Sequence, residues 1–240
     1  MDFKYIGFLY SKTTYQENDC IVNILTSENE SISFKAKSLL KANSKQASAC
    51  NYFVLSEFVL SAKTILSNKT LKTATIIKQY HVPYEDILVS SAYFIIFEVI
   101  QQIYEQMQDL YPLTLFCFER LEEKKHPILV LNYFFKQVCL ALGYAPNLFG
   151  CINCLSKKEL VAFDFSLGGF ICKNCFDSSI HQKLSTNLLK DIYQFLKVNE
   201  FIEMDLVHGN YLFDSYIQFL KEQGGLHFQS YEFFKKINKK

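Results

Sequence analysis

Four cysteines in the second half of the chain constrain its fold more than any other feature. Cys151 and Cys154 are separated by two residues, Cys172 and Cys175 are separated by two residues, and seventeen residues lie between the pairs. Two thiolates at this spacing can curl round one ion, and two such pairs supply four soft ligands at the corners of a tetrahedron. No ligand position stays open for water, so we expect one structural Zn²⁺.

The residues between the two pairs predict a β-hairpin. Residues 162–171 are mostly apolar, and Gly168-Gly169 permits a turn. A hairpin carrying two cysteine pairs predicts a zinc ribbon, inserted at residues 148–178. Two other interpretations stay open: four buried or redox-active thiols that happen to be paired, and an iron–sulfur cluster. The remaining cysteines lie in apolar surroundings, where we expect core packing. They are Cys20, Cys50, Cys117 and Cys139.

The first 80 residues and the rest of the chain predict different secondary structure. Five segments rich in β-branched and aromatic residues predict short strands, which fits a five-stranded barrel such as the oligonucleotide-binding fold. These segments are 3–10, 20–26, 31–37, 52–62 and 70–77. Residues 27–30 suit a hairpin turn. We therefore expect an α+β protein with a barrel domain at residues 1–82 and a mostly helical domain at residues 83–240.

Apolar periodicity beyond Pro83 predicts four helices. The first begins near Ile87 and ends at Pro112, and the second begins at Pro127 and stops at Gly143, a residue suited to a left-handed cap. Ser185 is a suitable N-cap for a third helix over residues 186–197. The fourth covers residues 211–223.

Charge is unevenly distributed along the chain. Residues 31–82 contain eight lysines and one acid, Glu57, and so carry +7, whereas the remainder carries −6 because the total is +1. Alternation in the third strand buries Phe34 and points lysines outward. We expect DNA phosphates to contact Lys35, Lys37, Lys41 and Lys45. The interleaved aromatics Phe34, Tyr52, Phe53 and Phe58 suit base stacking, although some of them must be core. The alternative is a solvated face.

No sequence motif predicts an enzyme. The chain lacks nucleophile-elbow, zinc-protease, Walker and dinucleotide-binding patterns, so binding is the better supported class. Its first residues carry no secretory signal, and its longest apolar stretch, residues 92–100, is far shorter than the ~20 residues that span a bilayer. We expect a cytoplasmic protein without a membrane partner.

Several segments follow one another in the order and at the intervals typical of one protein family. Residues 7–10 and 21–26 match its opening strands, residues 15–19 its Y-x-E-x-D turn, and residues 34–45 its basic A-K-G-x-R segment, with Ser38 and a lysine in place of Gly and Arg. Residues 142–146 match its L-G-y-x-P segment, residues 163–170 its F-x-x-x-x-G-G element beside the cysteines, and residues 228–234 its terminal S-x-x-F element. Over essentially the whole chain the sequence therefore resembles the RecO family of bacterial DNA-repair proteins.

The resemblance implies a recombination mediator. Such a protein has an N-terminal oligonucleotide-binding barrel and a helical domain with a zinc ribbon, and it binds single- and double-stranded DNA near the nucleoid. It anneals complementary strands and, with RecR, helps load RecA onto strands coated by single-strand-binding protein. The C-terminal tail of that protein docks on the helical domain. Candidate lysines for a basic rim there are Lys124, Lys125, Lys136, Lys190 and Lys197.

Two other classes stay open. The first is a zinc-ribbon accessory protein of translation or transcription that binds RNA through the same barrel. The second is a nuclease or other metalloenzyme whose site the sequence does not reveal.

Overall fold

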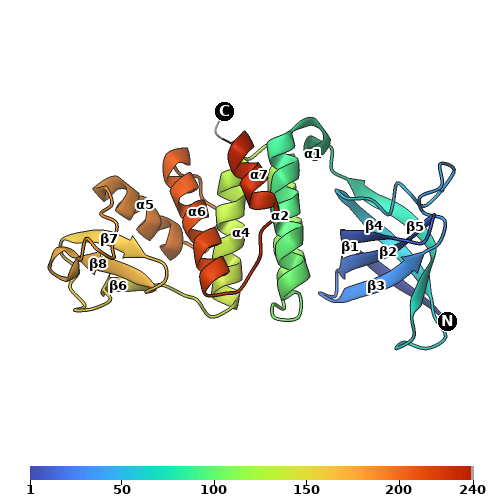
Figure 1. The fold of residues 1–240 in the computed structure, drawn as a ribbon, viewed down its shortest axis with the longest axis horizontal. Helices are drawn as coiled ribbons and strands as arrows, with labels where there is room; N and C mark the ends of the chain where they lie inside the picture. The colour runs from blue at the N-terminus through green and yellow to red at the C-terminus, as the bar shows by residue number, and fades with distance from the viewer. Residues whose placement is uncertain (239–240) are drawn as a thin grey trace. The chain divides into compact units, whose positions relative to one another are not determined.

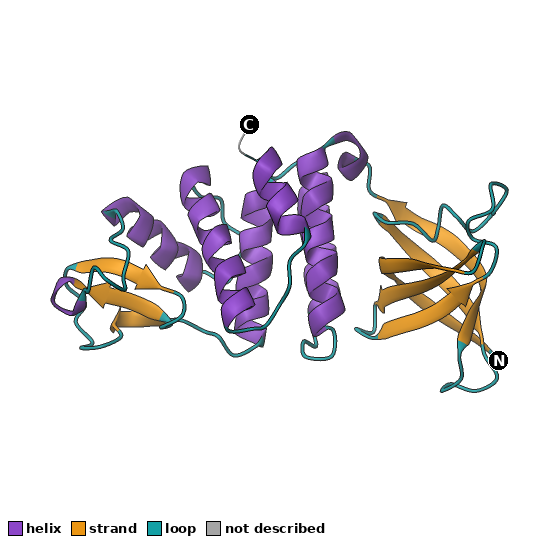
Figure 2. Ribbon diagram, viewed as in Figure 1, coloured by secondary structure: helices purple, strands orange, loops and turns teal. Residues whose placement is uncertain are grey.

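The computed structural model describes residues 1–238 and has the mixed α+β architecture expected from the sequence (Figures 1 and 2). Its contacts divide the chain into two compact units. Met1–Lys124 and Gln229–Lys240 form the first unit, and Lys125–Phe228 forms the second. Residue 82, the domain boundary expected from the sequence, lies where the last strand of the sheet, which ends at Gln79, gives way to the first helix, which begins at Val82.

Five strands of the first unit hydrogen bond in the order β1-β2-β3-β5-β4, and β4 pairs back with β1, so the sheet closes on itself. All five predicted strands are confirmed, as is the turn at residues 27–30. Their bounds are Asp2–Tyr15 (β1), Asp19–Thr26 (β2), Ser31–Ala36 (β3), Val54–Ser61 (β4) and Lys69–Gln79 (β5).

Alternation of side chains fixes which face of each strand is buried. In β2 the inward residues are Cys20, Val22 and Ile24, and in β4 every second residue is buried. A shift of one residue would carry these apolar side chains to solvent, so the core specifies the register. Antiparallel pairing dominates, and β3 pairs with β5 in parallel through Phe34–Lys69 and Lys35–Thr70.

Four helices belong to the first unit: α1 (Val82–Glu85), α2 (Ile87–Ile103), α3 (Leu110–Glu122) and α7 (Ser230–Ile237). The predicted start of α2 is confirmed, and Asp86 caps it by accepting from the N–H groups of Leu88 and Val89. The predicted end is wrong: α2 stops at Ile103, and Pro112 lies in the first turn of α3. Proline is tolerated there because the first-turn N–H groups have no partner within the helix.

The C-terminal helix α7 is fixed to α2 by a side chain. Glu98 of α2 accepts from the N–H of Ser230 at 3.0 Å and from its hydroxyl at 2.8 Å. These bonds join the C-terminal helix to the rest of the first unit, although more than 100 residues separate the two segments in the sequence. Helix α7 is not among the helices predicted from the sequence.

The second unit contains α4 (Pro127–Ala141), α5 (Thr186–Lys197) and α6 (Leu206–Glu222). The first two are confirmed, with Gly143 in the left-handed conformation (φ +84°) and the Ser185 hydroxyl accepting from the N–H of Leu188. Helix α6 starts five residues earlier than predicted, because Asp205 caps it by accepting from two N–H groups.

A three-stranded sheet follows α4, with strand order β6-β8-β7. Strands β7 (Leu160–Asp164) and β8 (Gly169–Cys172) form the predicted antiparallel hairpin, and β6 (Asn147–Cys151) adds a parallel strand to β8. The short 3₁₀ helix η1 (Lys173–Cys175) comes next. Within residues 1–238, no helix combines the length and the apolar character needed to cross a membrane.

Candidate metal centre and nucleic-acid interface

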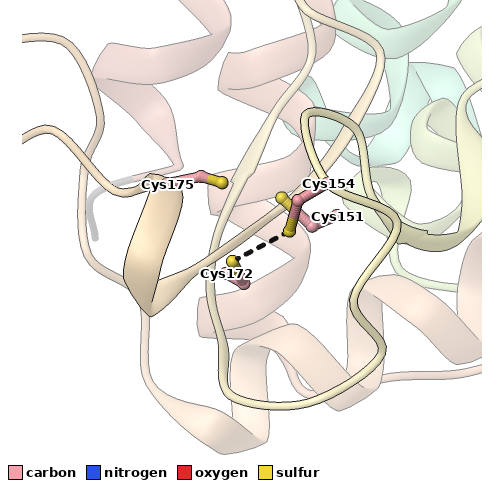
Figure 3. A group of neighbouring side chains, drawn as sticks. All are labelled: Cys151, Cys154, Cys172 and Cys175. Atoms are coloured by element: carbon pink, nitrogen blue, oxygen red, sulfur yellow. Dashed lines mark hydrogen bonds between the residues drawn. The ribbon is translucent and has the colours of Figure 1, made fainter.

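The four cysteines of the two C-x2-C pairs come together at one end of the three-stranded sheet (Figure 3). Their sulfur atoms all lie within 4.8 Å of one another, and Cys154 Sγ is 3.5 Å from Cys172 Sγ. All eight cysteines lie within residues 1–238 and are free thiols. The predicted pairing of the two motifs in space is therefore confirmed.

The donor set and its size fit a tetrahedral metal site. A zinc–sulfur bond of about 2.3 Å requires neighbouring sulfurs about 3.8 Å apart, which is within the spread observed here. Cys151 and Cys172 are buried, whereas Cys154 is exposed. Four thiol ligands could hold one soft metal ion and leave no position open for a substrate.

The loop that carries the first pair depends on close backbone contacts. The N–H of Cys151 donates to Ser156 O, and the N–H of Leu155 donates back to Cys151 O, both at 2.8 Å. Gly150 lies beside this turn at φ +155°, and a Cβ there would be 2.8 Å from Leu155 O. Glycine is therefore required for the loop to fold back under Cys151.

The second pair is placed by regular structure. Cys172 ends β8, whose partner β7 holds it through the Leu160–Cys172 pair, and η1 turns the chain so that Cys175 approaches the other sulfurs. Aromatic packing supports this hairpin, since Phe163 and Phe170 lie edge to face at 4.8 Å. The phenyl ring of Phe170 also lies 6.3 Å from Tyr193 of α5.

The thiols of the cluster differ in acidity. Burial opposes ionisation of Cys151, but backbone N–H groups of Cys172, Asn153 and Cys154 outweigh it and lower its pKa to about 6. Hydrogen bonding with Cys154 and Cys172 raises the pKa of Cys175 to about 12. Four thiolates repel one another, so a dication that replaces the protons would stabilise the cluster.

The four other cysteines are buried, as predicted. Burial raises the pKa of Cys50 and of Cys139 to about 12, so both are neutral thiols near pH 7. A buried, protonated thiol is a poor nucleophile and a poor metal ligand. These cysteines therefore pack in the two units as small apolar side chains.

The four predicted DNA-contacting lysines do not share one environment. Lys37, Lys41 and Lys45 are exposed, and within residues 1–238 no carboxylate forms an ion pair with them. Lys35 is half-buried and bound: its Nζ lies 2.9 Å from Asp19 Oδ2 and 4.5 Å from the centre of the Tyr15 ring. Three of the four are thus available to a ligand without breaking an ion pair.

Asp19 organises the start of the lysine-bearing loop, a role that sequence reasoning missed. Besides pairing with Lys35, it accepts the N–H of Ser38 at 2.7 Å, and these two bonds lower its pKa. Ser38 is left-handed (φ +54°), so the backbone turn suited to glycine is kept without glycine. The signal was an acid at the first position of β2, the strand that pairs with the lysine-bearing β3.

The loop at residues 37–53 is held at its far end as well. The side-chain oxygen of Gln46 accepts the N–H of Ala74 in β5 at 2.6 Å, and Leu39 and Cys50 are buried in the core of the sheet. Leu39, Gln46 and Cys50 therefore anchor the segment that carries the exposed lysines.

Three of the four aromatic residues named in the basic window are core residues. Phe34 and Phe58 are buried with ring centres 5.6 Å apart, and Phe53 is buried among Tyr84, Tyr93 and Phe94. The predictions that Phe34 points inward and that some of these aromatics are core are confirmed. The suggestion that Phe53 and Phe58 stack on bases is wrong, because both side chains are buried. The fourth, Tyr52, is half-buried, with its ring against Phe94 and Phe97.

Lys136 cannot belong to a basic rim, contrary to the sequence-based suggestion. Its side chain is 2 % exposed, and Nζ donates to Phe195 O at 2.7 Å and to Val198 O, at the C-terminal end of α5. Burial lowers its pKa to about 8. Lys136 and the buried Tyr216 line a void of about 30 Å³, about the volume of one water molecule.

Comparisons with known proteins match most of the chain. Residues 1–80 match the family model described as Recombination protein O N terminal, and residues 85–207 match that described as Recombination protein O C terminal. The chain is similar to the DNA repair protein RecO of Dehalococcoides mccartyi, with 28% identity over 83% of this chain and 80% of the relative. That of Listeria monocytogenes serotype 4b is 23% identical over 97% and 94%.

Proposed function

This chain belongs to the RecO family, and from that membership we propose that it acts in DNA repair as a recombination mediator. In this proposal it binds single- and double-stranded DNA and anneals complementary strands. Together with RecR it helps to load RecA onto strands coated by single-strand-binding protein. The DNA repair role is the part that its homologues support directly, because they carry it in their names.

The observation that carries the proposal is the group of exposed lysines on the loop between β3 and β4. Lys37, Lys41 and Lys45 are exposed and form no ion pair with a carboxylate within residues 1–238, and the loop is anchored by Asp19 and Gln46. A fixed array of ammonium groups neutralises backbone phosphates and releases condensed counterions. Such binding does not depend on base sequence, as an annealing protein requires.

The closed five-stranded sheet supports assignment to the oligonucleotide-binding fold, whose strand faces and loops meet single strands. Its core aromatics are covered, so bases would not stack on Phe34 or Phe58. Phosphate contacts therefore supply most of the affinity, and the loops supply the contacts.

We assign the cysteine cluster to one structural Zn²⁺, held by Cys151, Cys154, Cys172 and Cys175. Four ligands of the same kind and no free coordination position suit a zinc ribbon that joins α4 to α5. The protein is proposed to be a binding protein and not an enzyme, since all four cysteines would be metal ligands and would leave no coordination position open for a substrate.

The family's docking of the tail of single-strand-binding protein is proposed for the helices of the second unit. The void beside Lys136 and Tyr216 is too small for a peptide, at about 30 Å³, so docking there requires side chains to move. Of the other candidate rim lysines, Lys125 forms an ion pair with Glu203 at 2.6 Å, and the exposed Lys124 belongs to the first unit. The exposed lysines Lys190 and Lys197, on α5, are therefore the candidates on these helices to attract an acidic tail.

The salt dependence of binding tests the DNA interface. The double variant Lys37→Ala/Lys41→Ala should weaken binding to single-stranded DNA of any sequence, and the slope of log affinity against log salt should flatten by about 1.4, at about 0.7 per phosphate contact. The matched control is Lys157→Ala/Lys158→Ala, which removes the same charge from exposed positions of the second unit. An equal change of the salt slope in both variants would mean that the loop lysines contribute no more to DNA binding than other lysines on the surface.

RNA and cleavage assays separate the remaining classes. An RNA of the same base sequence should bind no more tightly than the DNA. Tighter binding of the RNA would instead indicate an RNA-binding accessory protein. Labelled DNA incubated with magnesium or manganese should stay intact, because cleavage would require a catalytic site. Annealing of complementary strands by the wild-type protein completes the test.

A further inference from the structure

The turn between β4 and β5 presents two large apolar side chains to solvent. Ile65 is 66% exposed and Leu66 is 94% exposed, although both occupy central positions of a turn that runs from Thr64 to Ser67. Central turn positions are normally filled by Gly, Pro, Asn, Asp or Ser. Isoleucine and leucine have no conformational advantage there, so their presence calls for a contact outside the chain.

Hydrogen bonds hold this turn in a defined shape. The hydroxyl of Ser67 accepts the N–H of Thr64 at 2.9 Å and donates to Thr64 O at 2.8 Å, and Lys69 Nζ donates to Ile65 O at 2.9 Å. The turn also projects from the end of the sheet beside the N-terminus (Figure 1), where the N–H of Ala62 donates to Met1 O. The two apolar side chains are therefore held away from the core of the sheet.

Two lysines flank the turn. Lys63 and Lys69 lie within three residues of the apolar pair, whereas Lys72 and Lys78, further along β5, form ion pairs with Asp2 and Glu119. Strand β5 begins at Lys69, where it pairs with Phe34 of β3, and β3 leads directly into the loop that carries Lys37 and Lys41. The turn and the basic loop thus belong to neighbouring strands of one closed sheet.

We propose that Ile65 and Leu66 form an apolar wedge that inserts against the bases of single-stranded DNA, while Lys63 and Lys69 contact the flanking phosphates. In proteins that bind the minor groove of duplex DNA, leucine and isoleucine side chains insert between base steps and partly unstack them, and we infer the same action here on a single strand. A nucleic acid combines a polyanionic backbone with apolar base faces, and so it complements both the lysines and the exposed pair. The inference rests on the proposed function and adds unstacking to it.

A fluorescent base analogue tests the wedge in the full-length protein. The double variant Ile65→Ser/Leu66→Ser should bind single-stranded DNA roughly fivefold to tenfold more weakly, with an unchanged salt slope because no charge is removed. A 2-aminopurine in the oligonucleotide should brighten on binding wild type, because unstacking relieves its quenching, and should brighten little with the variant. Leu66→Met should keep both properties.

The control is Ile180→Ser, which removes an apolar side chain that is 69% exposed in the second unit and should behave like wild type. Since the turn is exposed, unfolding temperatures should agree among all variants. If the double variant bound single-stranded DNA with the affinity of the wild type and with the same rise in fluorescence, the wedge would be overturned and the proposed function would stand. Failure of the wild type to bind DNA would overturn the proposed function and the wedge together. Loss of binding to anionic phosphatidylglycerol vesicles, with DNA binding intact, would assign the turn to a membrane surface and overturn the wedge.

Discussion

The N-terminal sheet and the cysteine-bearing sheet are both small β structures, but different forces hold them together. Inside the first, ten buried residues form a continuous apolar core: Leu9, Cys20, Val22, Ile24, Phe34, Ala36, Leu39, Cys50, Phe58 and Leu60. The second has few buried apolar side chains of its own, chiefly Ala162, Phe163, Phe170 and Ile171, and borrows contacts from α5 and α6.

Under the proposed assignments, this difference explains why the cysteines would serve structure in one region while lysines of the other would bind DNA. Fixing each residue costs about 1.5 kcal/mol of conformational entropy, which a few buried side chains cannot offset, so a segment as short as the ribbon needs a cross-link or a metal. The closed sheet has enough core to fold without one. Its loops can therefore carry exposed charge and exposed apolar residues.

Removing a metal ligand should have the largest effect and should be confined to one region. Cys172→Ser should lose the metal and leave residues 148–178 without stable structure, because structural zinc contributes on the order of 10 kcal/mol to such modules. Metal analysis should find about one zinc per chain in the wild type and far less in the variant. Amide exchange should show lost protection in the ribbon and unchanged protection in β1–β5.

Cys139→Ala is the control for this experiment, because Cys139 is a buried thiol of the same unit outside the cluster. It should retain the full zinc content while losing some packing energy. Full zinc content in Cys172→Ser would contradict the four-ligand assignment.

The converse experiment is a cavity in the core of the N-terminal sheet. Phe58 is fully buried against Phe34, so Phe58→Ala should lower the free energy of unfolding of the first unit by about 3–5 kcal/mol. Denaturant titration measures the loss, and zinc content should stay at the wild-type value. Release of zinc by this variant would show that the two regions depend on each other for stability.

A buried lysine adds a pH-dependent effect in the second unit. Burial lowers the pKa of Lys136 from 10.5 to about 8, so between these values the unfolded chain holds a proton that the folded chain has released. Stability contributed by this group should therefore rise with pH from about 8 to about 10.5 and be absent below. Thermal unfolding of the wild type and of Lys136→Met at a series of pH values measures this contribution. The stability of the wild type relative to the variant should increase between pH 8 and 10.5.

Subtracting the stability of Lys136→Met from that of the wild type isolates the contribution of Lys136, because the tyrosines and cysteines are the same in both. Substituting the exposed Lys190 by Met supplies the control and should show no such trend. A difference that stays constant from pH 8 to 10.5 would mean that the folded state keeps Lys136 charged.

Features set by local pattern could be predicted from the sequence. Enrichment in β-branched and aromatic residues located the five strands, cysteine spacing located the cluster, and Ser185 as an N-cap identified the start of α5. Each depends on residues close together in the chain. Helix α3 escaped because Pro112 suits both the end of one helix and the first turn of the next, and the sequence alone does not choose between them.

Features set by tertiary contacts could not be predicted. Lys35 looks like its neighbours in the sequence, but Asp19 of the adjacent strand binds it. Phe53 resembles a stacking platform until other rings cover it, and Lys136 resembles a surface lysine until α5 closes over it. Spacing alone did not indicate any of these contacts, since each joins residues from different elements.

The smallest expected effect concerns Ser38, the left-handed residue at the start of the basic loop. Ser38 adopts φ +54°, which is unfavourable for a residue with a Cβ, and Asp19 holds it there through a 2.7 Å hydrogen bond from the Ser38 N–H. Glycine removes the steric cost but increases the entropy of the unfolded chain, so Ser38→Gly should raise the free energy of unfolding by only about 0.5 kcal/mol. Ser33→Gly, at an exposed position in β3, should lower it by about 0.5–1 kcal/mol, because glycine weakens a strand interior. Denaturant midpoints of the two variants should therefore move in opposite directions, while the salt slope of DNA binding stays unchanged because neither variant alters charge. Movement in the same direction would mean that Asp19, and not the conformation of residue 38, determines the path of the loop.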